Sequence, residues 1–246
     1  MAEAAGAAFV LIHGGHQGSW FWERVTPLLD GSALAVDLPG RGRHPADLST
    51  VGIELTAESV IADIEEAGLE RVILAGNSIA SATIPGVAAR LRGRVDHLVF
   101  LGTPIAVEGQ TLMGSFPPEV QSLAAQRLRT NGGSMNTTDD DRRFMSCNDM
   151  DDEQANFVLT RAVPDSVRLF REPLSWAGTE DVPRTYIRLL KDQALVLPTQ
   201  DHMITNLRHT GGPVDIVDLD AGHCPMISDP EGTAEVLNEI AARSRP

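Results

Sequence analysis

Short apolar runs alternate along most of the chain with stretches in which apolar residues recur every three or four positions. A short apolar run predicts a buried strand, and the longer spacing predicts an amphipathic helix. Strands alternating with helices in turn predict an α/β fold with a mostly parallel central sheet and helices on both faces. The predicted strands lie at 8–13, 33–38, 71–74, 95–101, 185–190 and 214–219, and the predicted helices at 20–29, from Thr56 onward, at 79–91 and at 232–243.

The stretch 105–183 interrupts this alternation, because it contains helical pieces such as 152–161 and no recognisable strand. We expect a core formed by 1–104 and 184–246, with 105–183 inserted as a helical cap over the carboxyl ends of the strands. A cap in that place excludes water from a site beneath it. The alternative is a loosely packed surface insertion, against which stand the apolar residues Leu112, Met113, Phe116, Phe144, Met145, Phe157 and Leu159.

Ser78 stands where a predicted buried strand meets a predicted helix. A serine on such a sharp turn is a nucleophile elbow, in which small neighbours let strand and helix approach closely. Gly76 and Ala80 are those neighbours, with Ala80 in the place of the second glycine of the usual Gly-x-Ser-x-Gly pattern. The alternative is an ordinary turn in which Ser78 only caps the helix.

A serine hydroxyl becomes a nucleophile when a base, usually a histidine oriented by a carboxylate, accepts its proton. Among the seven histidines, His223 follows the last predicted strand and so reaches the carboxyl edge of the sheet, where Ser78 also lies. Asp192 follows the strand 185–190 and reaches the same edge. Asp201 is the alternative carboxylate, and we prefer Asp192 because Asp201 falls within the next helical segment.

The same chemistry needs backbone N–H donors for a developing oxyanion. One donor comes from the residue after the nucleophile, Ile79, and the other from a loop after an early strand. Gly15, in the sequence His13-Gly14-Gly15-His16, is the candidate for that loop. The alternative is an ordinary Gly-Gly turn.

Composition narrows the class of protein. The 246 residues and 42% hydrophobic content suit one α/β domain with an insertion. No apolar run is long enough to span a bilayer, and the N-terminus lacks the basic region of a signal peptide, so we expect a cytoplasmic protein. The formal charge of −14 argues against nucleic acid or an anionic membrane as partner. Cys147 and Cys224 match no zinc motif and offer at most one disulfide.

Four stretches resemble the α/β-hydrolase superfamily: 9–22, 37–42, the elbow at 74–81, and 221–223. Within it the chain resembles the plant methyl esterase and hydroxynitrile lyase group and its bacterial relatives. Asp192 together with 197–200, and the cap segment 147–161, add weaker likenesses, so that the resemblance spans nearly the whole chain. The resemblance implies a catalytic triad of Ser78, Asp192 and His223. It also implies an oxyanion hole formed by Gly15 and Ile79.

Three positions depart from this group. Its lyases carry a threonine directly after the first histidine and a lysine directly after the catalytic histidine, where this chain has Gly14 and Cys224. Without that lysine there is no evident cation for a cyanide leaving group, which favours ester hydrolysis over cyanohydrin cleavage. Asn77 replaces the histidine that commonly precedes the nucleophile, and its effect on the pocket floor is left open.

We therefore expect a cofactor-free serine hydrolase that acts on a carboxylic ester of the methyl ester or lactone type in a small molecule. One alternative uses the same site for carbon–carbon cleavage or lyase chemistry on a polyketide-like or small carbonyl substrate, which the departures at Asn77 and Ala80 motivate. Another is a non-catalytic ligand-binding receptor. The sequence leaves open whether the chain forms a homo-oligomer.

The predicted pocket is apolar, which suits a hydrophobic acyl group or an aromatic ester. The candidates for its lining are His16, Trp20, Met113, Phe116, Phe157, Trp176, Met203 and Met226. Side chains of these types more often belong to the ordinary core or surface than to a pocket.

Overall fold

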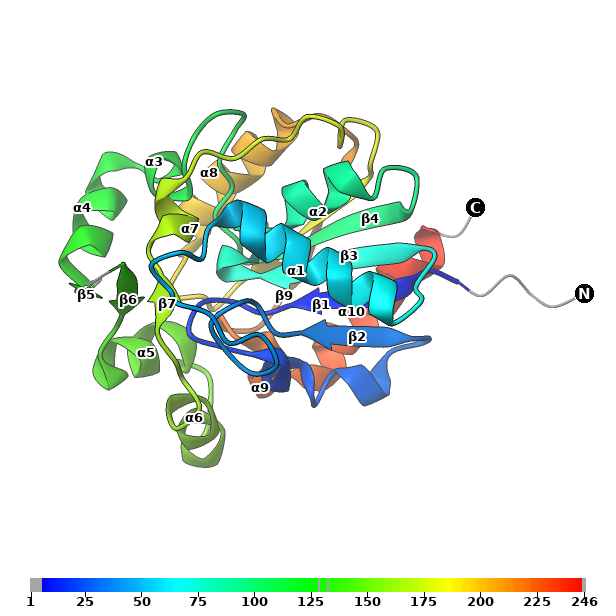
Figure 1. Cartoon of the computed structure of the whole chain (residues 1–246). Coiled ribbons are helices and arrows are strands. Elements are labelled where there is room, and N and C mark those ends of the chain that lie inside the picture. The colour runs from blue at the N-terminus through cyan, green and yellow to red at the C-terminus, as the bar shows by residue number, and fades with distance from the viewer. Residues whose placement is uncertain (1–5, 128, 132, 245–246) are drawn as a thin grey trace, which may run out of the picture.

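A six-stranded parallel sheet forms the centre of the molecule (Figure 1). The computed structural model describes residues 6–127, 129–131 and 133–244. The strand order is β2-β1-β3-β4-β8-β9, and each strand runs parallel to its neighbours. The predicted mostly parallel sheet is thereby confirmed. Its strands are β1 (Ala8–Ile12), β2 (Ala33–Val36), β3 (Val72–Asn77), β4 (Val95–Leu101), β8 (Arg184–Leu189) and β9 (Val214–Leu219).

Helices cover both faces of this sheet (Figure 1). One face packs against α1 (Ile53–Glu66), α2 (Ile84–Arg90) and α8 (Leu197–Arg208). The other packs against α10 (Pro230–Arg243), α9 (Pro225–Ser228) and the 3₁₀ helix η1 (Ser19–Trp22). The prediction of helices on both faces is confirmed.

The strand β1 shows why short apolar runs were sufficient to locate the sheet. Phe9 and Leu11 point into one half of the core, whereas Val10 and Ile12 point into the other. All four are at most 1% exposed. Each such side chain stabilises the fold by about 1.5–3 kcal/mol through burial, so a strand in this position has to be apolar on both faces.

Two predicted helices take a different form. The stretch 20–29 is not one helix but two 3₁₀ turns, η1 and η2 (Thr26–Leu28), and Leu28 is 42% exposed. Pro27 lies within the stretch, and a proline ring clashes with the preceding turn of an α-helix. The predicted helix 79–91 is likewise divided into η3 (Ser78–Ala82) and α2, whose first turn contains Pro85.

The segment between β4 and β8 lies over the carboxyl ends of the strands, opposite the end where the chain enters β1 (Figure 1). We call this segment, 105–183, the cap. The structure corrects one expectation here, because the cap contains a small antiparallel sheet as well as helices. Its strands are only two or three residues long, too short for a detectable alternation. They are β5 (Arg129–Asn131), β6 (Ser134–Asn136) and β7 (Asp165–Ser166).

Two of the longer helices of the cap begin after polar residues whose side chains accept N–H groups of the first turn. Thr138 accepts the N–H of Asp141, and Asp151 forms a reciprocal capping box with Gln154. The predicted helical piece 152–161 is confirmed as α6. The cap helices are α3 (Leu112–Ser115), α4 (Pro118–Arg127), α5 (Asp139–Ser146), α6 (Asp152–Leu159) and α7 (Arg168–Arg171).

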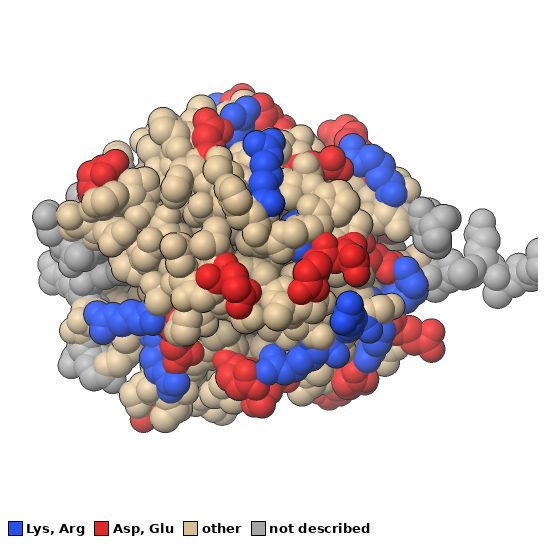
Figure 2. Space-filling view, turned by 90° about the horizontal axis from the view of Figure 1, so that it is seen from above, with Lys and Arg blue, Asp and Glu red and all other residues tan. Residues whose placement is uncertain are grey.

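Charged side chains of both signs are interspersed over the face seen in Figure 2. Surface ion pairs of the molecule include Arg90 with Glu54 and Arg94 with Glu65. Within the part of the chain that the structure describes, no helix has the length and apolar character needed to cross a bilayer.

Candidate active site

Ser78 directly follows β3 and begins η3, and its backbone has a φ of +53°. Among the described residues other than glycine, only His16 shares a positive φ. This left-handed conformation is costly for a residue with a side chain, and it aims the serine away from both flanking elements. Ser78 therefore has the backbone expected of a nucleophile elbow.

Gly76 makes the elbow possible for a chain that carries alanine at position 80. A Cβ atom on Gly76 would lie 2.5 Å from the Cβ of Ala80 and 2.9 Å from the Cδ1 of Ile84. The methyl group of Ala80 thus occupies space that the missing side chain of Gly76 leaves free. The departure from the usual second glycine is compensated within the elbow itself.

We expect Gly76→Ala to destabilise the fold by about 1–3 kcal/mol, because it overpacks this contact. Combining it with Ala80→Gly removes the closest clash, so the double variant should lose less stability than the sum of the single losses. Urea unfolding of the three variants measures this. Additive losses would show that the two positions do not share the space.

His223 lies on the loop after β9, and its Nδ1 is 2.7 Å from Oδ2 of Asp192. The residues are 4% and 3% exposed. The second oxygen of Asp192 accepts the backbone N–H groups of Ala194 and Leu195, at 2.7 and 2.8 Å. The carboxylate is therefore fixed, and it orients the imidazole so that Nε2 is left for another partner.

Asp201, the other candidate carboxylate, lies elsewhere. Its side chain is 57% exposed on α8 and pairs with Arg188, with 2.9 Å between Oδ1 and Nη1. The structure thus brings Asp192, and not Asp201, to His223.

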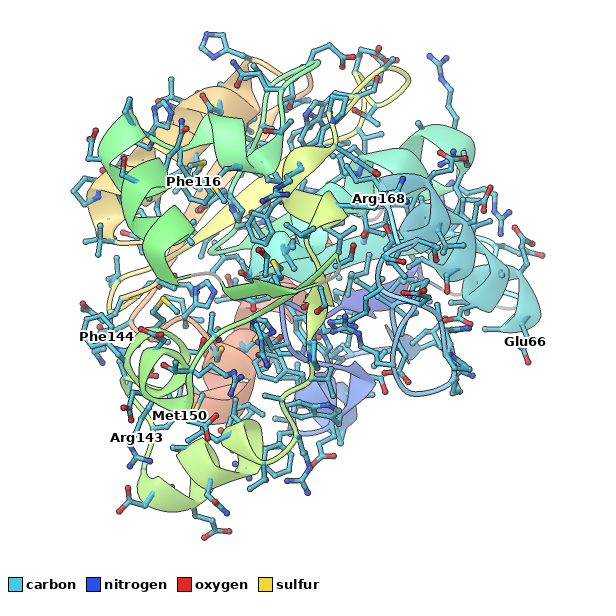
Figure 3. All side chains as sticks on the ribbon, turned by 60° about the vertical axis from the view of Figure 1, so that its left-hand side comes forward. Glu66, Phe116, Arg143, Phe144, Met150 and Arg168 are labelled. Atoms are coloured by element: carbon cyan, nitrogen blue, oxygen red, sulfur yellow. The ribbon has the colours of Figure 1, made fainter. Side chains whose placement is uncertain are left out.

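A cavity of about 170 Å³ opens beside Ser78 and His223, which both line it. Most of its wall is apolar. Phe116 contributes from the cap and packs beside α8 (Figure 3). The lining residues are Gly15, His16, Gln17, Ser78, Ile79, Pro104, Phe116, Met135, Thr137, Arg142, Met145, Ser146, Phe170, Ala194, Leu195 and His223.

The loop after β1 brings Gly15 close to the elbow. A Cβ atom on Gly14 would lie 3.1 Å from the Cβ of Ser78, and one on Gly15 would lie 3.8 Å from Cγ2 of Ile79. The Gly14 N–H donates to Oε1 of Gln17 at 2.7 Å, whereas the Gly15 N–H has no partner among the described residues. Ile79 is the second residue of η3, so its N–H has no acceptor within the helix. Two N–H groups are thus available beside Ser78.

The model of the "Alpha/beta hydrolase family" matches residues 9–236 of the chain. The chain belongs to the alpha/beta hydrolase family. The predicted fold class is therefore confirmed, as is the expectation of an enzyme of this family.

Similar proteins carry the names of esterases. The chain is 27% identical to "Putative methylesterase 11, chloroplastic" of Arabidopsis thaliana, over 95% of this chain and 63% of the relative. It is also 27% identical to the "Carbendazim hydrolyzing esterase" of Nocardioides sp. strain SG-4G, over 94% of this chain and 98% of the relative. The chain thus spans less than two thirds of the plant relative and nearly the whole of the bacterial one.

A solved structure of similar fold is an extracellular alpha/beta-hydrolase from a Paenibacillus species, described as homologous in structure and function to Tobacco Salicylic Acid Binding Protein 2. Its TM-score is 0.81 at 23% identity, with 95% of this chain and 98% of that chain covered. At this identity the likeness shows the fold alone.

Only two of the predicted pocket residues, His16 and Phe116, line the cavity of this alpha/beta hydrolase. Trp20 and Phe157 instead pack edge-on against each other, with ring centroids 5.4 Å apart. The guanidinium of Arg161 covers the Phe157 ring at 3.9 Å. Their aromatic character did not indicate whether these side chains face the cavity or each other.

The other predicted lining residues also lie outside the cavity. Trp176 is 2% exposed, and its Nε1 donates to the carbonyl of Ala106 at 2.8 Å. Met226 and Met203 are fully buried in the core, on opposite faces of the sheet. Met113 is half-buried on α3 and does not reach the lining.

Sequence reasoning missed the residues that β6 and α5 contribute to the cavity. Met145 was among the apolar residues expected in the cap, but Met135, Thr137 and Arg142 carried no sequence signal. Arg142 is 9% exposed, and its guanidinium bonds to Asp139, to the Asn136 side chain and to the Thr137 carbonyl. Within the described ranges, no group of three or more His, Cys, Asp and Glu side chains is arranged to hold a metal ion.

Asn77 has a definite role in the structure. Its Nδ2 donates to the carbonyls of Leu101 and His223, both at 3.0 Å, and the residue is fully buried. It therefore ties the end of β3 to β4 and to the loop that carries His223. The sequence left this role open, because neither carbonyl can be identified from the order of residues.

His13, at the end of β1, is a buried neutral base. Burial, assisted by the charge of Arg41, lowers its pKa to about 4. Its Nε2 accepts the N–H of Leu38 at 3.1 Å, and its Nδ1 lies 2.8 Å from the Gly14 carbonyl. The folded protein thus resists protonating a group that the unfolded chain protonates below about pH 6.5.

We expect this difference to make the fold less stable in acid. Above about pH 6.5 the neutral His13 makes its full contribution to the free energy of unfolding. This contribution, about 3 kcal/mol in total, is lost as the pH falls toward 4. Urea unfolding of wild type and His13→Asn over this range measures it, and the variant should show a smaller loss. His209→Asn, at an exposed histidine of the α8 C-terminus, is the control. Equal pH slopes for wild type and His13→Asn would contradict the assignment.

Proposed function

We propose that this alpha/beta hydrolase is a cofactor-free serine hydrolase that cleaves a carboxylic ester through an acyl-enzyme. The observation that carries the proposal is the buried Asp192–His223 pair at the cavity that Ser78 also lines. Along the chain the nucleophile comes first, the orienting carboxylate second and the base last, which is the order that this fold uses. The backbone of Ser78, with its φ of +53°, adds independent support.

Each group has a role in the proposed reaction. Nε2 of His223 accepts the proton of the Ser78 hydroxyl as its oxygen attacks the ester carbonyl. Asp192 keeps the imidazole in the required tautomer and stabilises the imidazolium. The N–H groups of Gly15 and Ile79 bind the oxyanion, and His223 then gives its proton to the departing alcohol. Water, activated by His223, releases the acid from Ser78.

The cavity and the relatives support a small ester as substrate. The volume of about 170 Å³ and the apolar wall, which includes Phe116, Phe170 and Met135, favour a compact hydrophobic acyl group. The relative named a putative methylesterase supports methyl-ester chemistry, and the one named a carbendazim hydrolyzing esterase supports ester hydrolysis. We therefore propose a methyl ester or lactone as the substrate type.

The two departures that motivated the alternative of lyase or carbon–carbon chemistry, Asn77 and Ala80, each have a structural role that needs no such chemistry. Asn77 is accounted for by its two backbone contacts, and Ala80 by the space above Gly76. Cys224, in the position of the lyase lysine, is fully buried and accepts a hydrogen bond from Gln17 at 3.6 Å. It offers no positive charge to a leaving group.

A fluorophosphonate probe tests the proposal, since it labels only an activated serine. We expect mass spectrometry to find the label on Ser78 in wild type and in Ser81→Ala, and no label in Ser78→Ala. Ser81 is a matched control because it lies in the same 3₁₀ helix but is fully buried, with its hydroxyl on the Pro104 carbonyl. A folded wild type that is not labelled would contradict the proposed serine chemistry.

A further inference from the structure

A buried ion pair between the cap and the loop after β2 lies beside the loop that carries Gly15. Arg41 follows β2, and Asp165 belongs to β7 of the cap. Their side chains are 4% and 2% exposed. A pair so deeply buried needs further hydrogen bonds to compensate the loss of hydration, and both partners have them.

These hydrogen bonds converge on the residues after Gly15. One oxygen of Asp165 accepts from Nη2 of Arg41, and the other accepts the backbone N–H of His16. Nη1 of Arg41 donates to the carbonyl of Gln17 at 2.6 Å. The cap and the loop are also joined through Val163, whose N–H donates to the His16 carbonyl at 3.0 Å. The left-handed backbone of His16, with a φ of +64°, is held by these contacts.

The orientation of the Gly15 N–H follows from this arrangement. The preceding N–H, of Gly14, is held by the Gln17 side chain, and the following N–H, of His16, is held by Asp165. Gly15 lies between two fixed peptide groups while its own N–H stays free among the described residues. A donor that is fixed before the reaction stabilises an oxyanion most effectively.

Asp165 also brings a negative charge close to that donor. Its Oδ2 would lie only 3.5 Å from a Cβ atom on Gly15. In a site without water, an unpaired carboxylate at this place would repel the oxyanion. Arg41 supplies the compensating positive charge.

We propose that Arg41 and Asp165 are positioning residues of the oxyanion hole: Asp165 fixes the loop that presents Gly15, and Arg41 cancels the charge that this carboxylate would otherwise direct at the oxyanion. The proposal rests on the proposed ester hydrolysis. It gives the cap a part in the chemistry beyond covering the cavity.

The surrounding charges determine how the pair titrates. Burial by itself raises the pKa of Asp165, but the charge of Arg41, then that of His16 and the hydrogen bonds from both, outweigh it and lower the pKa. His13 also faces the pair, and burial keeps it neutral. The charges next to these histidines are Arg142 beside His16 and Asp37 beside His13. Removing Arg41 takes away the largest influence that keeps Asp165 ionised.

Four variants test the charge compensation: Arg41→Met, Arg41→Met with Asp165→Asn, Arg41→Lys, and Arg71→Met. Arg71 is a control because its ion pair with Asp96 lies at the start of β3 and β4, at the opposite end of the sheet. The readouts are kcat and KM for p-nitrophenyl acetate, and the rate of phosphonylation by a fluorophosphonate, between about pH 5 and pH 9.

We expect Arg41→Met to lower kcat by about a hundredfold at alkaline pH, with little change in KM. Its rate should fall as the pH rises, because burial raises the pKa of a carboxyl that has lost its cation, and Asp165 repels the oxyanion once it ionises. Wild type should show no such descending limb. Adding Asp165→Asn to Arg41→Met should remove the descending limb and return kcat to within about tenfold of wild type. Arg41→Lys, which keeps the positive charge, should also have a kcat within about tenfold of wild type and no descending limb. Arg71→Met should match wild type.

Several results would overturn the proposal. One is a double variant as slow as Arg41→Met with the same pH profile, because the loss would then be structural. If Arg41→Met does not fold, Arg41→Lys decides, and a hundredfold loss in kcat despite the retained charge would count against the proposal. Ser78→Ala distinguishes failure of the proposed function from failure of the proposed role of the ion pair. An unchanged rate in Ser78→Ala refutes ester hydrolysis at this serine. An inactive Ser78→Ala, together with a double variant no faster than Arg41→Met, refutes only the role of the pair.

Discussion

Ser78→Ala is expected to lower kcat for p-nitrophenyl acetate by about 10⁴- to 10⁶-fold, the range found when the nucleophile of a comparable triad is removed. Alanine offers no oxygen to form the acyl-enzyme, so only the oxyanion hole and substrate binding remain to accelerate attack by water. The substitution removes one atom at the cavity wall, and no hydrogen bond of the Ser78 hydroxyl with the described residues is lost. KM and the urea midpoint should therefore change little.

The control for this experiment is Ser32→Ala. Ser32 is an exposed serine directly before β2, at the amino ends of the strands and hence away from the cavity. Its loss should leave kcat unchanged. Equal rates for wild type and Ser78→Ala would exclude the proposed mechanism, whatever the fold.

Asp192→Asn is expected to have the second largest effect, a decrease in kcat of about 10³- to 10⁴-fold. The asparagine retains an oxygen for the N–H groups of Ala194 and Leu195, so the loop keeps its shape. What changes is the group that faces Nδ1 of His223, at 2.7 Å in the native pair. An amide NH₂ there favours the tautomer with its proton on Nε2, and such an imidazole cannot accept the proton of Ser78.

Asp201→Asn is the matched control, and it decides between the two aspartates that the sequence offered. Asp201 interacts with Arg188, which keeps a second partner in Asp218 at 2.8 and 2.9 Å after the change. Activity should therefore stay at the wild-type level. An unchanged Asp192→Asn together with an inactive Asp201→Asn would reverse the assignment.

The sequence was sufficient where a local pattern has one physical outcome. The apolar run Phe9–Leu11 has to be buried on both faces, so its composition alone places β1 inside the sheet. Ser78, Asp192 and His223 each follow a predicted strand of one parallel sheet, and the carboxyl ends of such strands meet at one edge. Their proximity was therefore predicted from the topology of the parallel sheet, and not from any pairwise contact.

The cavity wall was predicted poorly because it depends on which residues of the cap face inward. Trp20 and Phe157 are large and apolar, as pocket residues often are, but they satisfy each other outside the cavity. Thr137 and Arg142 are polar and line it all the same, because the short strand β6 and the first turn of α5 bring them there. No periodicity in the sequence predicts strands of three residues.

The sequence by itself determined the parallel sheet, its helical layers and the edge where the proposed catalytic groups gather, because burial imposes a regular pattern on strands and helices. Only the tertiary structure decided that Arg41 pairs with Asp165, 124 positions further along the chain, and that Asn77 holds the loop of His223. A buried charge or amide requires a hydrogen-bond partner, but the sequence does not indicate which residue that partner is. That choice is made when the cap packs against the core and each buried polar group takes the partner that lies within its reach.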